Sequence, residues 1–215
     1  MTKFLALAVG GFVAIAASPA MALTTSNSTS FGPTPTDFTT STLTLQPFDT
    51  TLGTLNSATV TLFANANVSG SVKNTGATAA NFTVSSTTTV SLNSTNASIA
   101  SVTTNLFATQ TYNQLPPGAT AAYGPYTPSS SASVSASPLS AFQSGPISFT
   151  ASTSTGDSGV GGGGNSIRSF TTTAGGSVTV VYDYTVRPTL VPEPASMALL
   201  GMGLAGLGLI RRRSV

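Results

Sequence analysis

The segment Ser177–Val186, SVTVVYDYTV, is the strongest strand signal in this chain. Valine, threonine and tyrosine are enriched in strands because their branched or aromatic side chains pack well on a pleated surface. We therefore expect this segment to form a central strand. Side chains alternate between the two faces of a strand, so Tyr182 and Tyr184 share one face and Asp183 lies on the other. Core packing of the two tyrosines is favoured over an aromatic platform for sugar rings.

Weaker signals of the same kind precede this segment. Alternating apolar and hydroxyl residues predict strands at Thr40–Gln46, Ala58–Ala64, Asn67–Lys73, Asn81–Leu92 (one long strand or two short ones), Ile99–Gln110 and Pro146–Ala151. Leu23–Asp37 predicts an irregular lead-in or an edge strand. The sequence shows neither an amphipathic helical stretch nor a fixed repeat period. This pattern favours an all-β fold, and a β-sandwich over a β-solenoid.

Residues that favour turns mark the connections between these segments. Asp49–Leu55 carries turn chemistry around its glycine, and Asn74–Gly76 is a second turn signal. We expect Leu115–Pro128 to be a loop with at most one short strand. We expect the low-complexity segment Ser129–Ser137 to be mobile, and the glycine-rich segment Thr155–Ser166 to be a flexible loop.

Charged residues are scarce in this chain, at 6% of the sequence, against roughly 25% in ordinary globular proteins. The segment between the two ends has a net charge of −1, from Lys73, Arg168 and Arg187 against Asp37, Asp49, Asp157 and Asp183. The ends contribute +3, from Lys3 and Arg211–Arg213 against Glu193, so the positive sign of the formal net charge of +2 comes from the ends. The segment has no basic patch, which argues against nucleic acid as a partner. Few charged side chains are available to prevent exposed strand edges from pairing with another copy, which favours self-association.

The chain contains neither cysteine nor histidine. Disulfides, cysteine metal sites, the commonest zinc ligand and the usual general base are therefore excluded. We expect no catalytic residues, no metal site and no cofactor, and a protein that is not an enzyme. A hydrolase with a Ser–Lys dyad at Lys73 is the weaker alternative, because nothing in the sequence places a serine beside this lysine.

Several residues have a functional interpretation beside a structural one. Asp49 is more readily a turn cap than a calcium ligand, because one carboxylate cannot supply the roughly six to eight oxygen ligands that calcium takes. Asp157 is more readily part of a solvated loop than of an ion site. Tyr112, Tyr123 and Tyr126 lie in loop-like regions and are the better candidates for carbohydrate contact.

The N-terminus has the three parts of a secretory signal. Met1–Lys3 supplies a positive charge, Phe4–Ala17 is apolar, and the small residues Ala20 and Ala22 define a cleavage site. We expect a signal peptide over residues 1–22, cleavage by signal peptidase after Ala22, and a mature chain that begins at Leu23.

The C-terminus also has three parts. The motif Val191, Pro192, Glu193 and Pro194 precedes an uncharged apolar segment at 195–210, which is followed by Arg211, Arg212 and Arg213. As a helix, the apolar segment would be about 24 Å long, and snorkelling arginines would help it to match a hydrocarbon core of about 30 Å. We expect a single transmembrane helix, with the three arginines as a membrane stop on the cytoplasmic side.

This arrangement resembles the PEP-CTERM sorting signal of Gram-negative bacteria. The resemblance rests on VPEP, the segment ASMALLGMGLAGLGLI and the RRR end, in this order at the C-terminus. It implies that an exosortase, a membrane transpeptidase-like enzyme, recognises Pro192, Glu193 and Pro194 and removes the tail during export. The implied partners are the exosortase and, transiently, the inner membrane, with exopolysaccharide as a further candidate. The implied location is the cell surface or the extracellular matrix.

The expected organisation is thus a signal peptide, a β-sandwich ectodomain over residues 23–190 and a sorting tail over residues 191–215. Within the ectodomain, Pro47–Leu62 (PFDTTLGTLNSATVTL) resembles the opening of choice-of-anchor E domains. Val180–Thr185 (VVYDYT) is similar to the last strand of that family. These bacterial ectodomains occur with differing surface-anchoring tails, and the resemblance implies no defined biochemical activity.

Two hypotheses for the ectodomain follow from the sequence. We favour a non-enzymatic, exported surface or matrix protein. The alternative is a binding module whose hydroxyl-rich surface recognises carbohydrate or, through ordered threonine arrays, ice. The Thr-x-Thr pairs, such as those at Thr42 and Thr59, do not recur at constant intervals, which makes ice the less favoured ligand.

Overall fold

The computed structural model describes residues 21–95, 99–187 and 200–205. The chain separates into two compact units, of which one comprises Ala22–Val186 and the other comprises Met1–Met21 with Arg187–Val215. In its described residues, the first unit contains nine strands and two 3-10 turns. They are β1 (Ala22–Pro35), β2 (Thr39–Leu45), β3 (Gly53–Asn74), β4 (Ala80–Ser94), β5 (Val102–Leu115), β6 (Thr120–Tyr126), β7 (Ser129–Ser135), η1 (Leu139–Phe142), β8 (Ile147–Gly161), η2 (Gly162–Gly164) and β9 (Ser166–Val186).

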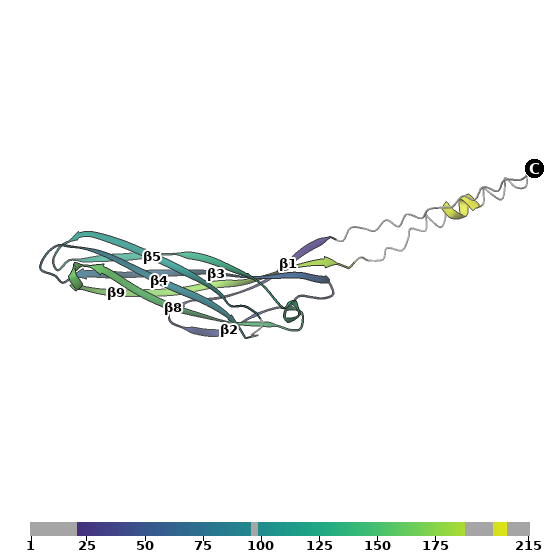
Figure 1. Ribbon diagram of the computed structural model, residues 1–215, viewed down its shortest axis with the longest axis horizontal. Coiled ribbons are helices and arrows are strands. Elements are labelled where there is room, and N and C mark those ends of the chain that lie inside the picture. The colour runs from purple at the N-terminus through teal and green to yellow at the C-terminus, as the bar shows by residue number, and fades with distance from the viewer. Residues whose placement is uncertain (1–20, 96–98, 188–199, 206–215) are drawn as a thin grey trace, which may run out of the picture. The chain divides into compact units, whose positions relative to one another are not determined.

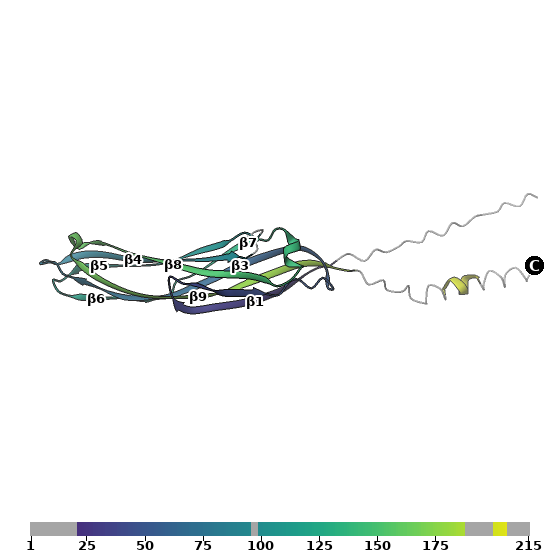
Figure 2. The same cartoon turned by 90° about the horizontal axis from the view of Figure 1, so that it is seen from below.

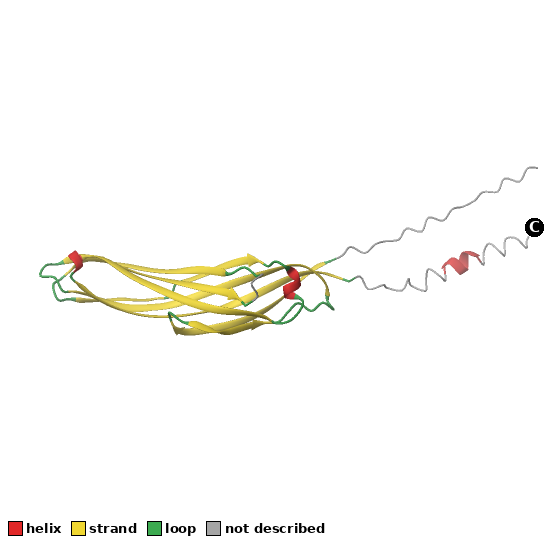
Figure 3. Cartoon of the chain, turned by 60° about the horizontal axis from the view of Figure 1, so that its bottom comes forward, coloured by secondary structure: helices red, strands yellow, loops and turns green. Residues whose placement is uncertain are grey.

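The strands form two antiparallel sheets in two layers (Figures 1 and 3). The strand order is β2-β8-β4-β5 in the four-stranded sheet and β1-β9-β3-β6 in the five-stranded sheet, where β7 also pairs with β3. The strand expected to be central, β9, lies between β1 and β3. The expected all-β fold is confirmed, and its two layers are those of a sandwich.

Two very long strands form the centre of the five-stranded sheet (Figure 2). β3 has 22 residues and β9 has 21, and they pair from Gly53 opposite Val186 to Asn74 opposite Ser166. At about 3.3 Å per residue, each strand is about 70 Å long. The prediction of two separate strands in the β3 region is wrong, because Ala64, Ala66 and Val68 continue the buried face without a break.

An interrupted edge strand lies along the other side of β3. β6 pairs with Val68–Lys73 and β7 pairs with Thr59–Asn65, so β6 and β7 follow one another along the same margin. Pro128, which cannot donate a hydrogen bond, lies between them, and edge strands tolerate proline. The expected short strand within Leu115–Pro128 is confirmed as β6. The expectation that Ser129–Ser137 is mobile is wrong, because β7 is a paired strand.

The glycine-rich segment Thr155–Ser166 is also mostly strand. β8 continues to Gly161 and pairs with β4 from Phe82 to Ser94. The chain turns at Gly162–Gly164, where all three glycines have positive φ angles. Glycine adopts these angles without the steric cost that a side chain would add. The expected flexible loop is therefore wrong except for this short turn.

Most other strand expectations are confirmed with extended bounds. β2, β4 and β5 overlap the predicted segments, and β4 is one long strand. Of the two alternatives for Leu23–Asp37, the edge strand is correct, because β1 pairs with β9 alone from Ala22 to Pro35. Phe31 is the buried anchor of β1, and most of its other side chains are exposed.

One hydrophobic core lies between the sheets. Alternate side chains of the long strands point into it; in β4, for example, the even-numbered residues from Phe82 to Leu92 are buried. Phe48 packs against Tyr182 and Tyr184, with ring centroids 5.7 and 5.3 Å apart. Both tyrosines are buried, so their interpretation as core residues is confirmed.

The outer faces of both sheets carry rows of hydroxyl groups. Because neighbouring strands are in register, these hydroxyls meet across strands and hydrogen-bond to one another. The oxygen–oxygen distances are 3.2 Å for Thr83 and Thr111, 2.7 Å for Ser85 and Ser158, 3.2 Å for Ser91 and Thr103, and 2.8 Å for Thr61 and Ser133. The surface of the sandwich is therefore polar through hydroxyl groups, with few charges.

Candidate functional site: the two ends of the domain and its surface hollows

The first and last residues of the folded unit lie on neighbouring strands. Ala22, the last residue of the predicted signal peptide, is the first residue of β1 and pairs with Thr185 near the end of β9. β9 ends at Val186, six residues before Pro192 of the sorting motif. The domain thus begins and ends on neighbouring strands, and each predicted processing site lies within a few residues of one of these ends in the sequence.

Most of the predicted sorting residues lie outside the described residues. These are Ala20, Val191, Pro192, Glu193, Pro194, Arg211, Arg212 and Arg213. Within the expected transmembrane segment at 195–210, residues 200–205 are described, and they are helical. In the described parts of the chain, the structure has no helix with the length and apolar character needed to cross a membrane.

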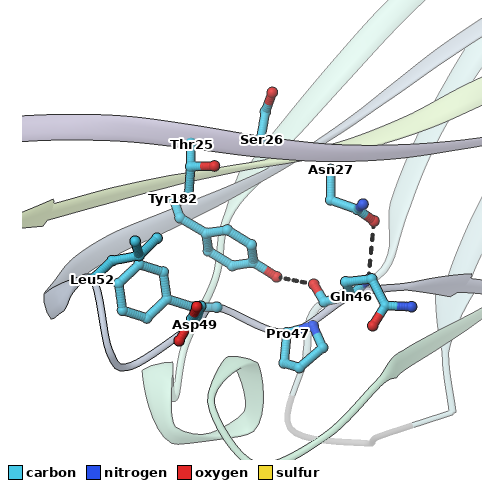
Figure 4. Close-up of a pocket in the computed structure, with 9 residues that line it drawn as sticks. Thr25, Ser26, Asn27, Gln46, Pro47, Asp49, Leu52 and Tyr182 are labelled. Atoms are coloured by element: carbon cyan, nitrogen blue, oxygen red, sulfur yellow. Dashed lines mark hydrogen bonds between the residues drawn. The ribbon is translucent and has the colours of Figure 1, made fainter.

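A small hollow lies beside the paired segments of β1 and β9 (Figure 4). It has a volume of about 180 Å³ and is bounded by β1, the segment that follows β2, and Tyr182 of β9. The Tyr182 hydroxyl donates a hydrogen bond of 2.8 Å to the carbonyl oxygen of Gln46. The backbone N–H of Gln46 donates one of 2.9 Å to Oδ1 of Asn27. These bonds join β1 and β9 to the segment that follows β2, so the polar groups of the hollow stabilise the fold.

Burial raises the pKa of Tyr182 to about 12. The cause is desolvation, which disfavours the phenolate form in the core. At neutral pH the hydroxyl is therefore protonated and can act as the donor to Gln46. This arrangement is suited to holding β9 against the opposite sheet and not to proton transfer.

Asp49 caps its own turn, as the favoured interpretation predicts. Its Oδ1 accepts hydrogen bonds from the backbone N–H and the hydroxyl of Thr51, at 2.9 and 2.7 Å. These two bonds stabilise the carboxylate and hold the pKa of Asp49 below its usual value. Among the described residues, no group of three or more acidic side chains lies close enough together to hold a metal ion.

Asp157 does not lie in a loop, contrary to expectation. It belongs to β8 and pairs with Ser86. Gly159 lies two residues beyond Asp157 on β8, and the side chain of Arg168 from β9 lies directly over it. An added Cβ on Gly159 would be 2.1 Å from Nη1 of this arginine. β8 and β9 have no outer partner strand here, because β2 pairs with β8 only as far as Ser152 and β1 pairs with β9 only from Thr173 onward.

Tyr112, Tyr123 and Tyr126 also lie on strands and not in loops. They connect β5 of one sheet to β6 of the other. The Tyr123 hydroxyl donates to the carbonyl oxygen of Ala108 at 2.7 Å, Tyr112 donates to the Ala122 carbonyl, and Tyr126 bonds to the Gln110 side chain. Desolvation raises the pKa values of Tyr112 and Tyr123. These tyrosines close one side of the sandwich, so the expectation that they lie in loops is wrong, and Tyr123 is buried. Carbohydrate contact through the half-buried Tyr112 and Tyr126 stays a prediction.

Lys73 does not face a serine in the ladder of its sheet. Its cross-strand partners are Ile167 on β9 and Thr120 on β6. The pairing therefore gives no support to a Ser–Lys dyad at this position.

Comparison with known proteins identifies the C-terminal segment. Residues 190–213 match the family described as PEP-CTERM protein-sorting motif. This match indicates an exosortase-targeted secreted protein that is exported to the cell envelope or surface of a Gram-negative bacterium. It supports the exosortase as a processing partner. No curated protein matches the chain, and the resemblance to choice-of-anchor E domains stays a hypothesis.

Among solved structures, a chain from the crystal structure of the T13 IBDV viral particle is similar over 86% of this chain, at 10% sequence identity and a TM-score of 0.16. The alignment covers 46% of that chain, so this protein spans less than half of its length. A TM-score this low supports no statement about fold or function.

Proposed function

We propose that the mature protein is a non-enzymatic component of the cell surface or extracellular matrix. Signal peptidase removes residues 1–22, and the exosortase removes the tail at Pro192, Glu193 and Pro194. The product is the β-sandwich, with the inner membrane as a transient partner held through the segment at 195–210.

The observation that carries this proposal is the place where the folded unit ends. The compact unit is complete at Val186, and the matched sorting segment begins at residue 190. Both sheets are therefore built from residues that precede the motif. Cleavage at the motif would release the tail without removing any of the described strands, as expected for a disposable sorting signal.

The distribution of reactive groups supports a non-enzymatic role. The four aspartates of the domain lie on different segments, at Asp37, Asp49, Asp157 and Asp183. The hydroxyls of Tyr112, Tyr123, Tyr126 and Tyr182 are engaged in bonds that join strands. The sequence supplies neither histidine nor cysteine. An acid–base pair or an activated nucleophile therefore has few residues from which to be built.

A matrix location is supported by the character of the surface. Rows of serine and threonine cover both sheets, and the domain has a net charge of −1. Such a surface is hydrated through hydroxyl groups, and charge repulsion between copies is weak. Both properties suit a protein that is packed densely outside the cell.

The test is processing in a Gram-negative host with and without its exosortase. In the wild-type chain we expect loss of the C-terminal tail and delivery to the surface. Replacement of Pro192, Glu193 and Pro194 by alanine, or deletion of the exosortase, should leave a full-length tail and a membrane-retained protein. Pro188→Ala, outside the motif, is the matched control and should be processed normally. Unchanged processing of the triple variant would show that the proposal is wrong.

A further inference from the structure

The outer face of the five-stranded sheet has a groove where β1 departs from regular pairing. The β1–β9 register shifts between Phe31 and Thr34, and Gly175 and Gly176 lie on the facing part of β9. An added Cβ on Gly176 would be 2.2 Å from the carbonyl oxygen of Phe63, so glycine is needed for this close approach of the two backbones. The bulge and the missing side chains leave a hollow of about 340 Å³.

A second hollow of about 260 Å³ adjoins the first. The two share Pro33, Asn65 and Gly175, and the second continues to Asn67 and to Thr127 between β6 and β7. Together they form one groove that crosses the sheet from β1 over β9 and β3. We call it the glycine groove, and its principal side chains are Ser30, Pro33, Phe63, Asn65, Asn67 and Thr173.

The glycine groove combines an apolar wall with planar amides. Phe63 is 45% exposed, although its side chain is large and apolar. Asn65 and Asn67 lie next to it on the same face of β3, and both are exposed. Each amide offers two donor hydrogens and an acceptor oxygen. Among the described residues that line the two hollows, none is charged.

The polar side chains of the groove are not engaged with other side chains. Asn65, Asn67 and Ser177 form no side-chain hydrogen bond with the described residues, in contrast with the hydroxyls elsewhere on these faces. On the opposite sheet, Thr83 and Ser85 each bond to a cross-strand partner. The donors and acceptors of the groove are therefore available to a ligand.

We propose that the glycine groove binds a neutral glycan chain. A sugar ring presents a C–H face, which packs on an aromatic ring, and hydroxyls, which exchange hydrogen bonds with amides and other hydroxyls. An anionic glycan would bury carboxylates without a cationic partner, which is unfavourable. Two adjoining hollows suit consecutive sugar units of a chain better than a free monosaccharide. This activity goes beyond sorting, because the groove lies wholly in the folded unit.

The experiment uses the purified full-length chain in a zwitterionic detergent, whose head group carries no sugar. The neutral probes are cello-, xylo- and isomalto-oligosaccharides, the anionic probe is oligogalacturonate, and binding is measured by isothermal titration calorimetry. We expect binding to at least one neutral series, and affinity at least about tenfold lower in Phe63→Ser and in Asn65→Ala. Phe107→Ser is the matched control, because Phe107 is an exposed phenylalanine of the opposite sheet, and it should bind normally.

Circular dichroism and urea unfolding of each variant separate lost binding from lost folding. The proposal is overturned if no neutral series binds, if only oligogalacturonate binds, or if Phe63→Ser binds as tightly as the wild type. It is also overturned if Phe107→Ser loses affinity equally. Self-association that Phe63→Ser abolishes, without glycan binding, would instead make the groove an interface between copies. None of these results depends on tail processing, so they stand apart from the test of sorting.

Discussion

Tyr182→Phe should destabilise the domain by removing one hydrogen bond between its sheets. Tyr182 lies on the central strand β9, and its hydroxyl donates to the Gln46 carbonyl beyond the end of β2, at 2.8 Å. A hydrogen bond of this kind contributes about 0.5–1.5 kcal/mol to stability. In the variant, water from the adjoining hollow of about 180 Å³ can hydrogen-bond to the Gln46 carbonyl in place of the tyrosine hydroxyl. We therefore expect a loss of about 1 kcal/mol in the free energy of unfolding.

The same variant should change the alkaline limb of the stability profile. Tyr182 has a pKa raised to about 12 in the folded state, against about 10 for an exposed tyrosine. The folded protein thus retains a proton that the unfolded chain releases. The stabilisation that the folded state gains from this pKa difference is complete below pH 10. About 2 kcal/mol of it is lost as the pH rises toward 12. Tyr112 and Tyr123 also have raised pKa values, so only the difference between wild type and variant isolates Tyr182.

Urea unfolding of the full-length chain at pH 7 and across pH 9–12, followed by circular dichroism, measures both effects. Tyr184→Phe is the matched control, because Tyr184 lies on the same face of β9 and also packs on Phe48, yet its hydroxyl has no hydrogen bond among the described residues. We expect the control to lose less than about 0.5 kcal/mol. Equal losses in both variants, or an alkaline limb unchanged in Tyr182→Phe, would refute the reasoning.

Three further predictions concern single residues of the domain. Gly70→Ala should lower the free energy of unfolding in urea by about 1–3 kcal/mol, because the added Cβ would lie 2.1 Å from the Ser169 carbonyl oxygen. Gly156→Ala is the control: its Cβ would meet no atom within 4 Å, so stability should change by less than about 1 kcal/mol. Arg168→Thr should increase self-association in sedimentation velocity, because it removes a charge from the unpaired margin of β8 and β9; a monomeric variant at matched concentration would contradict this. Asp49→Ala should be less stable than the wild type above the usual aspartate pKa, because the lowered pKa of Asp49 shows that the folded state stabilises its carboxylate. This stabilisation is lost as the pH falls through the lowered pKa, so the unfolding free energies of wild type and variant should converge in acid. A constant difference between them down to pH 2 would argue against this prediction.

The sequence predicts those strands whose apolar and polar residues alternate. The central position of β9 and the burial of Tyr182 follow from this pattern alone. β7 and the second half of β8 do not, because runs of serine and glycine have low strand propensity. They become strands because β3 and β4 offer complete partners for pairing.

The surface features were harder to predict than the sorting tail. A sorting signal is a local pattern, so the sequence shows it directly. The glycine groove joins Pro33, Phe63 and Gly175, which are far apart in the chain and meet only through the register of three strands. The tyrosines of β5 and β6 were misassigned for the same reason, since nothing in their local sequence reveals the opposite sheet.

The most direct test of the central claim is the intact mass of the protein recovered from the surface or medium of an exosortase-bearing host. We expect a polypeptide that begins at Leu23, ends at or near Pro192–Pro194 and lacks Arg211–Arg213. A recovered mass equal to the whole of Met1–Val215 would contradict it.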